Sequence, residues 1–276
     1  MAAPITAVLS GGGARAAAHV GALEVLHQAG VEPSRYVATS MGAVIAAMAA
    51  GGLAPREIAE RLFRVRRGDV FRLDRTSLLR GWFSRSLLRP EPFREVLAGL
   101  VPARSFAELA IPLSVTATDL DSGELGVFGA GGAEVPLLDA LCASTALPPW
   151  FPPFLIGERR WADGGLRAVV PLEVAARFPA GLVIAIDVGA GFDTAATQDG
   201  PPAPTLLKLW NDTQWIMMAS NTEAQRARWG AVPGRPPLRW IRPAVRRGET
   251  FAVEQLQWYR EKGREAARAA LSAQHP

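Results

Sequence analysis

Apolar and polar residues alternate over the first fifty positions in a pattern that predicts two successive strand and helix units. A short β-branched run at Ile5–Leu9 ends in three glycines, and the segment after them keeps its apolar positions on one helical face until Gly30. A second short apolar run at 36–39 leads into an alanine-rich helix at 43–50, which two glycines close. Repeated strand and helix units of this length are typical of parallel βα folds.

The same alternation returns after a long helical interruption. Residues 54–101 predict helices broken by a loop at 81–84, and the proline-rich run at 148–153 must be extended. Further strands are expected at 111–118, 125–128, 182–188 and 238–241, and further helices at 137–144, after Pro171, at 205–228 and at 251–271. The loop at 193–204 is the one plausible linker. We therefore predict a single α/β domain over residues 1–276, with a helical C-terminal addition at 205–276.

Composition favours a packed globule whose charge is unevenly placed. Of the 276 residues, 49% are hydrophobic and 20% are charged, which argues against extensive disorder. The formal net charge is +4. Ten arginines and four acidic residues lie between 61 and 97, and seven arginines with no acid lie between 226 and 247. These stretches could face anionic lipid or nucleic acid, but an arginine-rich solvated surface is the simpler explanation.

Nothing in the pattern indicates secretion or membrane spanning. No segment approaches the roughly 18 uninterrupted apolar residues that a spanning helix needs. Residues 1–10 lack the basic start and long apolar region of a signal peptide. The one cysteine, Cys142, cannot form an internal disulfide, which suits a reducing compartment. We expect a cytoplasmic protein, with peripheral contact to an anionic inner membrane face as an open alternative.

Ser40 lies where the second predicted strand turns abruptly into a helix, in the sequence Ala38-Thr39-Ser40-Met41-Gly42. A serine on such an elbow projects its oxygen above the sheet edge, where the helix N-terminus stabilises a developing anion. The pattern departs from GxSxG because Ala38 replaces the first glycine. Taken alone, a serine in a small-residue turn is more often structural than catalytic.

A glycine turn, Gly11-Gly12-Gly13-Ala14-Arg15, follows the first strand and lies at the same predicted sheet edge as Ser40. Backbone N–H groups in such a turn can cradle a phosphate or form an oxyanion hole, and this element alone does not choose between them. Gly11, Gly13 and Ala16 also match the dinucleotide fingerprint. That fingerprint requires an acidic residue at the end of the second strand, where this chain has Thr39 and Ser40, so a Rossmann-type cofactor site is disfavoured.

A nucleophilic serine needs a base, and the three histidines are poor candidates. His19 and His27 lie within the first helix, and His275 is the penultimate residue. Asp163, in Trp161-Ala162-Asp163-Gly164-Gly165, ends a short strand on a tight turn that can project a carboxylate into a cleft. Within reach of Ser40 it could accept the hydroxyl proton and then activate water. Taken singly, the same residues are also typical of a hairpin turn.

Other reactive or apolar groups indicate structural roles. Asp119 and Asp121 close a strand without further metal ligands nearby, so a turn is expected. Cys142 has the setting of a small core residue rather than of a thiol nucleophile. The stretch with Trp210, Trp215, Ile216, Met217 and Met218 predicts core packing, with an acyl-chain wall as the alternative.

Several of these motifs, in this order, resemble the patatin-like phospholipase family, especially its compact bacterial members. The resemblance runs from about Ala7 to Val188. It comprises the glycine turn, the elbow Thr39-Ser40-Met41-Gly42, the run Thr116-Ala117-Thr118-Asp119, the segment Ala143-Ser144-Thr145-Ala146-Leu147-Pro148, and Asp163-Gly164-Gly165 with Pro171. The last 80 or so residues carry no such motif.

The resemblance implies a three-layer α/β/α sandwich with a mostly parallel central sheet and a Ser-Asp dyad. Ser40 would be the nucleophile and Asp163 the base, and the turn Gly11–Arg15 would be the oxyanion hole through N–H groups around Gly12, Gly13 and Ala14. No metal or cofactor is implied, and no nucleic acid partner is expected. The substrates would be phospholipids, lysophospholipids or other acyl esters.

The chain departs from the family pattern at three points, and the lost glycines among them motivate a rival hypothesis. Ala16 and Ala38 replace usual glycines, and Ala168 with Val169 stands where asparagine is usual. The rival is a lipid- or acyl-binding protein on the same fold with little or no catalysis. We further expect the apolar, arginine-bearing loop at 78–88, which contains Trp82 and Phe83, to form a lid or a membrane-facing surface.

Overall fold

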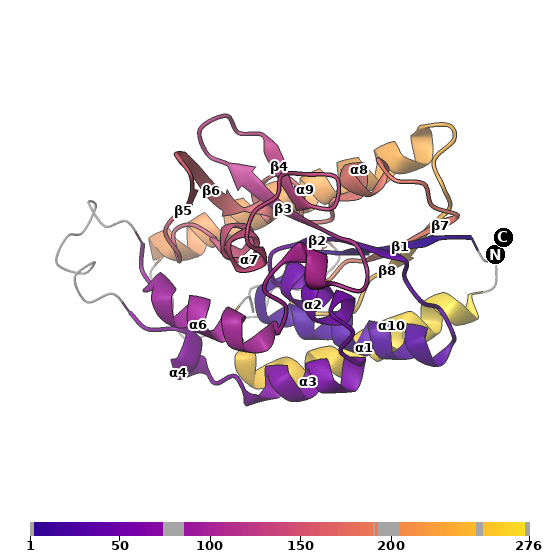
Figure 1. The fold of residues 1–276 in the computed structure, drawn as a ribbon, viewed down its shortest axis with the longest axis horizontal. Helices are drawn as coiled ribbons and strands as arrows, with labels where there is room; N and C mark the ends of the chain where they lie inside the picture. The colour runs from indigo at the N-terminus through magenta and orange to yellow at the C-terminus, as the bar shows by residue number, and fades with distance from the viewer. Residues whose placement is uncertain (1–2, 74–85, 190, 193–204, 247–250, 274–276) are drawn as a thin grey trace.

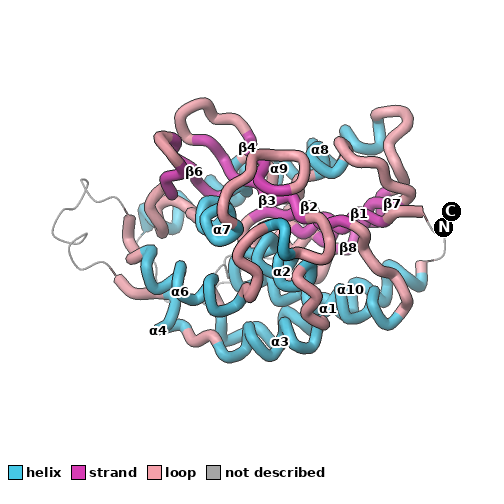
Figure 2. The backbone as a smooth tube through the Cα atoms, viewed as in Figure 1, coloured by secondary structure: helices cyan, strands magenta, loops and turns pink. Residues whose placement is uncertain are grey.

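A mixed β-sheet between two helical layers is the framework of the computed structural model, which describes residues 3–73, 86–189, 191–192, 205–246 and 251–273 (Figures 1 and 2). The predicted loop at 81–84, most of the expected lid at 78–88 and the linker at 193–204 lie outside the described residues. The α/β architecture expected from the sequence is confirmed.

The strands are β1 (Ile5–Leu9), β2 (Arg35–Thr39), β3 (Leu113–Asp119), β4 (Leu125–Gly129), β5 (Phe154–Ile156), β6 (Arg159–Asp163), β7 (Leu182–Ile186) and β8 (Leu238–Ile241). The α-helices are α1 (Ala17–Gln28), α2 (Met41–Ala50), α3 (Pro55–Arg64), α4 (Arg67–Val70), α6 (Pro90–Leu100), α7 (Leu137–Thr145), α8 (Leu172–Ala175), α9 (Thr205–Ala231) and α10 (Leu256–Ser272). Short 3-10 turns include η1 (Gly13–Ala16), η4 (Gly164–Leu166) and η5 (Val253–Gln255).

The central strands run parallel in the order β3-β2-β1-β7-β8. Three antiparallel pairings extend the sheet beyond β3, because β4 and β6 both pair with β3 and β5 pairs with β6. All seven residues of β3 are buried, as are the last four of β1, β2 and β7. Helices cover both faces of these strands, which explains their nearly continuous apolar runs.

The two faces of the sheet have separate cores. Ala7 and Leu9 of β1 contribute to the core under α1 and α2, whereas Val8 between them contributes to the core that includes Trp229 of α9. This is the two-residue alternation of a strand that is buried on both sides. Figure 1 shows α8 and α9 above the sheet and α1, α3 and α10 below it.

The segment from residue 205 onward is built into these layers. β8 pairs in parallel with β7 at one edge of the sheet. α10, near the end of the chain, packs along α1, which lies near its beginning. Residues 251–255, predicted as the start of the last helix, instead form a turn and η5, so α10 begins at Leu256.

The apolar stretch of α9 departs from expectation, because the predicted core packing of 210–218 is wrong for three of its residues. Trp210 and Ile216 are each 45% exposed, and Met217 is 68% exposed, whereas Trp215 and Met218 are half-buried. Ala219, Thr222 and Trp229 form the inward face, and helical periodicity turns the opposite side toward solvent.

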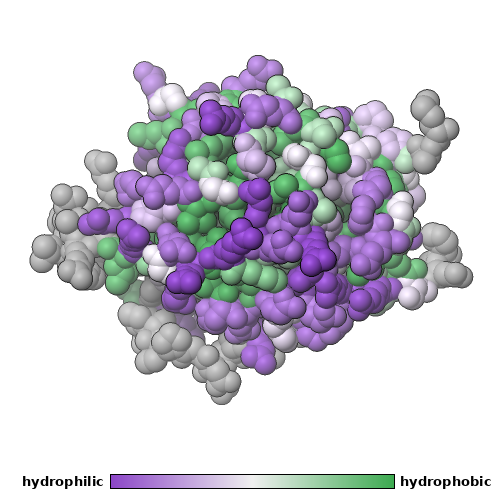
Figure 3. Space-filling view, turned by 60° about the horizontal axis from the view of Figure 1, so that its bottom comes forward, coloured by the Kyte–Doolittle hydropathy of each residue, from purple (hydrophilic) through white to green (hydrophobic). Residues whose placement is uncertain are grey.

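On the side of the molecule below the sheet, hydrophilic side chains cover much of the surface, with apolar surface showing between them (Figure 3). Among the described residues, no helix has both the length and the apolar character that a membrane span requires.

Candidate functional site

Ser40 occupies a strained elbow between β2, which ends at Thr39, and α2, which begins at Met41. With φ 54° it is the only residue other than glycine in the described part of the chain that has a positive φ. Such backbone costs on the order of 1–3 kcal/mol and persists only where its surroundings enforce it. Gly42 permits the sharp turn, because a Cβ there would lie 2.3 Å from the carbonyl oxygen of Ser10. The elbow therefore presses α2 directly against the end of β1.

Asp163 ends β6, whose pairing with β3 carries it to Ser40 across the sheet. In this register Asp163 lies opposite Ala117. The Ser40 hydroxyl donates a hydrogen bond to Oδ2 of Asp163 at 2.6 Å, and the backbone N–H of Gly165 donates to Oδ1 at 2.7 Å. Both side chains are buried, with 6% of Ser40 and 4% of Asp163 exposed. The two groups that the sequence placed 123 residues apart are thus in direct contact.

Burial governs the protonation of Asp163. Loss of water around the carboxylate raises its pKa from 3.8 to about 6, and the hydrogen bonds from Ser40 and Gly165 oppose this effect only in part. The carboxylate is therefore mostly ionised at neutral pH and is more basic than an exposed aspartate. In that form it can accept a proton from the hydroxyl that touches it.

The glycine turn lies beside Ser40. A Cβ on Gly11 would stand 3.3 Å from Cβ of Ser40. The N–H of Gly11 donates to the carbonyl of Val169 at 2.9 Å, and that of Arg15 donates to Gly12 at 3.2 Å, so these two are engaged. Within the described residues, the N–H groups of Gly12, Gly13 and Ala14 have no acceptor, as expected at the start of a helical turn. Of the five residues of the turn, Gly12, Gly13 and Ala14 thus have backbone N–H groups available to a ligand, whereas those of Gly11 and Arg15 are engaged within the fold.

Ser144 is a part of the site to which the sequence assigned no role. Its fully buried hydroxyl accepts a hydrogen bond of 2.7 Å from the backbone N–H of Ser40. This bond ties the elbow to α7, which otherwise packs on β3 and β6. The one available signal was the position of Ser144 in a small-residue run just before the prolines.

An ion pair with a buried carboxylate lies just after β7, next to the residue that packs on the glycine turn. Asp187 follows the last residue of β7, is fully buried, and lies 3.0 Å from the guanidinium of Arg242. The next residue, Val188, packs so closely on the turn that a Cβ on Gly12 would lie 2.5 Å from its side chain. Arg15 also lowers the pKa of Asp187 through its charge, although burial raises that pKa more strongly. Sequence reasoning missed both Asp187 and Arg242, because their pairing depends on the parallel contact of β7 with β8.

The replaced glycines are accommodated without disturbing the site. Ala38 and Ala16 are buried, with 0% and 2% exposed, and Ser40 keeps its elbow beside them. Ala168 and Val169 act through their backbone, since their carbonyls accept hydrogen bonds from the Thr39 hydroxyl at 2.9 Å and from the Gly11 N–H at 2.9 Å. These departures leave the reacting atoms in contact.

The remaining candidates from the sequence lie apart from this pair. His19 is fully buried, and its Nε2 donates to the carbonyl of Ser10 at 2.9 Å; burial lowers its pKa to about 4, so it is neutral at pH 7. His27 pairs with Glu32 at the surface, and His275 lies outside the described residues. Burial raises the pKa of the Cys142 thiol to about 11, which makes it a poor nucleophile.

Asp119 and Asp121 serve the turn between β3 and β4. Oδ1 of Asp119 accepts the backbone N–H of Asp121 at 2.8 Å, and Arg159 and Arg160 pair with the two carboxylates. In the part of the chain that the structure describes, no cluster of three or more His, Cys, Asp or Glu residues could hold a metal ion.

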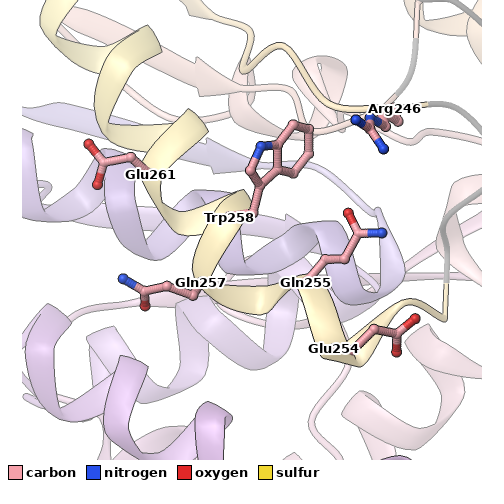
Figure 4. Close-up of a pocket in the computed structure, with 6 residues that line it drawn as sticks. All are labelled: Arg246, Glu254, Gln255, Gln257, Trp258 and Glu261. Carbon is pink, nitrogen blue, oxygen red and sulfur yellow. The ribbon is translucent and has the colours of Figure 1, made fainter.

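Two surface hollows lie away from the Ser40 and Asp163 pair. One, of about 690 Å³, is at the start of α10 and carries both acidic and basic side chains (Figure 4); its lining residues are Arg246, Glu254, Gln255, Gln257, Trp258 and Glu261. The other, of about 410 Å³, lies between α8 and the second half of α9. Neither is lined by a residue of the pair or of the glycine turn.

Comparisons with curated proteins find relatives that are mostly longer. An uncharacterized NTE family protein of Mycobacterium tuberculosis is 29% identical over 201 residues, which cover 73% of this chain and 53% of the relative. Patatin-like phospholipase domain-containing protein 7 of Rattus norvegicus is 28% identical over 225 residues, which cover 79% of this chain and 16% of that protein. The chain spans about half the length of the first of these relatives and less of the second.

The fold and the family model agree with this similarity. The crystal structure of VipD from Legionella pneumophila is similar with a TM-score of 0.51 and 13% identity, covering 98% of this chain and 67% of that one, a likeness of fold alone. A family model described as patatin-like phospholipase matches residues 7–176, more than half of the chain, and that range contains the glycine turn, Ser40 and Asp163. The resemblance found in the sequence is confirmed, and the chain belongs to the patatin-like phospholipase family.

Proposed function

We propose that the protein is a serine hydrolase of fatty-acyl esters, of the lipase, phospholipase A or lysophospholipase type, that uses Ser40 and Asp163 as a catalytic dyad. The observation that carries this proposal is the 2.6 Å hydrogen bond from the Ser40 hydroxyl to the buried carboxylate of Asp163, formed from a strained elbow. Strain of this kind gathers at functional sites. The family to which the chain belongs supports lipid esters as substrates.

In the first step Asp163 takes the hydroxyl proton while Oγ of Ser40 attacks the ester carbonyl carbon. The tetrahedral intermediate collapses to an acyl-enzyme as the alcohol leaves with a proton returned from Asp163. Water then gives its proton to Asp163 and attacks the acyl carbon, which releases the fatty acid and restores Ser40. The raised pKa of Asp163 suits a group that accepts and returns a proton in each half of the reaction.

Backbone N–H groups of Gly12, Gly13 and Ala14 would hold the oxyanion. They start η1 beside Ser40 and have no other acceptor among the described residues. In other hydrolases, removing one preorganised donor from such a hole by mutation costs about 3–4 kcal/mol of transition-state stabilisation. No cofactor or metal enters this scheme.

Short-chain nitrophenyl ester hydrolysis tests the dyad. We expect Ser40→Ala to abolish turnover and Asp163→Asn to lower kcat by roughly 10²–10⁴-fold, the usual contribution of a positioned base. Ser34→Ala and Asp121→Asn, which change exposed residues of the same types, should retain wild-type rates. Wild-type turnover in either dyad variant would refute the mechanism.

A fluorophosphonate probe separates this function from non-catalytic acyl binding. Only an activated serine is phosphonylated, so the wild-type protein should be labelled and the Ser40→Ala variant should not. A wild-type protein that binds fatty acid but resists the probe would favour the binding function.

A further inference from the structure

Exposed apolar side chains gather on the first half of α9. The outward positions there are Leu206 (67% exposed), Leu209 (56%), Trp210 (45%), Ile216 (45%) and Met217 (68%). With 3.6 residues per turn, these positions share one side of the helix, opposite the inward face that holds Ala219 and Thr222. A soluble protein rarely shows so many large apolar groups together unless something covers them.

The second half of the same helix provides an internal comparison. The outward side continues there with small and polar residues: Ser220, Glu223, Ala224, Ala227 and Arg228. The inner side of the second half is buried through Ala219, Thr222 and Trp229, whereas residues 208–211 in the first half are all exposed. Packing within the fold therefore does not explain the apolar character of the first half.

This apolar surface lies at the end of the molecule that holds the proposed catalytic site. Met218 of α9 contacts the loop after Asp163, since its Cε lies 2.8 Å from where a Cβ on Gly165 would be. Phe192, 49% exposed and just beyond β7, packs edge-on against Trp215 of α9 with ring centroids 5.1 Å apart. In Figure 1, α9 begins at the end of the sheet that is opposite the chain termini, where the parallel strands finish.

Exposed arginines stand at the same end of the molecule, on the other side of the sheet from α9, around α4 and α6 (Figure 1). Arg66, Arg72 and Arg89 surround α4 and the start of α6 and outnumber the exposed Asp69 and Glu91 there. The backbone N–H of Arg89 donates to the carbonyl of Arg72 at 3.0 Å. Within the described residues, none of the three has an acidic side chain at ion-pair distance. At the far end of α9, by contrast, Arg228 and Arg235 both pair with Glu173.

We propose that this end of the molecule docks on an anionic lipid surface, with the outward face of the first half of α9 inserted among the lipids and Arg66, Arg72 and Arg89 against their head groups. The inference rests on the proposed function, because docking here brings the Ser40 site to its substrate. Large apolar groups and cations gathered at one end of a molecule are what such a membrane can bind, through its apolar interior and its anionic head groups respectively. A second copy of the chain fits less well, since a symmetric contact over this end would bring the same cationic surface from both copies together.

Co-sedimentation with vesicles tests the docking surface without hydrolysis. The probe is a vesicle of equal parts diether phosphatidylcholine and diether phosphatidylglycerol, which has no ester bond to cleave. We expect the wild-type protein to bind it, and vesicles of the phosphatidylcholine analogue alone to bind more weakly. The double variant Trp210→Ser/Met217→Ser should partition about tenfold less. Val232→Ser, which changes an exposed apolar residue beyond the end of α9, should bind like wild type.

Other measurements keep this inference separate from the proposed function. The double variant should hydrolyse a water-soluble short-chain ester at the wild-type rate, because its two side chains do not touch Ser40 or Asp163. A wild-type protein that binds the vesicles but hydrolyses no ester would refute the proposed function and leave the docking surface standing. Vesicle binding unchanged by the double variant would overturn the docking surface. A wild-type dimer in analytical ultracentrifugation that the double variant dissociates would overturn it in favour of a second copy.

Discussion

At the scale of single residues, the environment of Asp163 determines how it can act. The carboxylate is buried, accepts one hydrogen bond from Ser40 and one from Gly165, and has no positive side chain paired with it among the described residues. Burial therefore prevails and raises its pKa to about 6. A catalytic base whose pKa lies close to neutral combines a useful ionised fraction with adequate basicity.

The rate of ester hydrolysis should follow this ionisation. We expect kcat/KM for a soluble ester to fall as the pH drops through about 6, because protonated Asp163 cannot accept the Ser40 proton. His19 is not expected to contribute to this limb, since its pKa is lowered to about 4 and it bonds to Ser10. The measurement is a pH–rate profile of the wild type beside His19→Gln. An inflection that vanishes in His19→Gln would assign the limb to the histidine instead.

The same pKa makes a prediction about stability. Between pH 3.8 and about 6 the folded protein keeps a proton on Asp163 that the unfolded chain has lost, so this group lowers stability as the pH rises through that window. Above it, the ionised carboxylate costs about 3 kcal/mol, at 1.36 kcal/mol per pKa unit. Urea unfolding should therefore show Asp163→Asn more stable than wild type at neutral pH, by up to that amount. The difference should shrink toward about pH 4, and a constant difference would contradict the shifted pKa.

Sequence reasoning could identify residues whose chemistry is local, but not their distant partners. Ser40 and the glycine turn each follow a strand, and Asp163 sits on its own Asp-Gly-Gly turn, so short patterns suffice to find them. Ser144 supports Ser40 from 104 residues away, and the small-residue run around it does not specify that bond. The pKa of Asp163 also depends on burial, which the packed fold alone establishes.

At the scale of elements, α1 and α10 are held together by close contact of their backbones. A Cβ on Gly21 of α1 would lie 1.8 Å from the carbonyl oxygen of Arg260, and one on Gly263 of α10 would lie 1.9 Å from that of Ala18. Glu24 of α1 is buried between Arg260 and Arg264 of α10. The two glycines therefore permit a helix crossing that larger residues would separate.

Substitution of the crossing glycine should destabilise the protein strongly. We expect Gly263→Ala to lower the free energy of unfolding by about 3 kcal/mol, because the added carbon meets backbone that cannot move aside without parting the helices. Gly230→Ala in α9 is the matched control: its Cβ would meet nothing within 4 Å, and the better helix propensity should leave stability equal or higher by up to about 1 kcal/mol. Urea denaturation of both variants measures the difference. Equal stabilities would contradict the close crossing.

Periodicity predicted the helices better than it predicted which of their faces are covered. The run at 210–218 is helical, as expected, but its apolar residues point both ways, because α9 has one inward face and the described parts of the chain leave the other exposed. The glycines of α1 and α10 were also uninformative in sequence, where Gly263 in an amphipathic helix looks merely unfavourable. Their role becomes visible once the two helices are placed together.

At the scale of the whole molecule, the alternation of strands and helices was enough to predict the α/β architecture. It was not enough to predict the order of the strands in the sheet. The parallel order β3-β2-β1-β7-β8 places the first strand of the chain at the centre and the last at an edge. The antiparallel pairing of β6 with β3 carries Asp163 to Ser40, and β4, β5 and β6 are strands of three to five residues with weak patterns. The site is therefore assembled by the part of the sheet that sequence patterns describe least well.

This order of strands also predicts how the molecule unfolds. Residues 238–241 pair with β7, and α10 packs on α1, so the segment from 205 onward shares both the sheet and a helical layer with the first 190 residues. We expect one cooperative unfolding transition for the whole chain, because neither part could separate without exposing buried apolar surface of the other. Calorimetry should give a single peak whose calorimetric and van't Hoff enthalpies agree. In Gly263→Ala that whole peak should move to lower temperature, and a second, unshifted peak would show instead that the C-terminal segment folds as a separate unit.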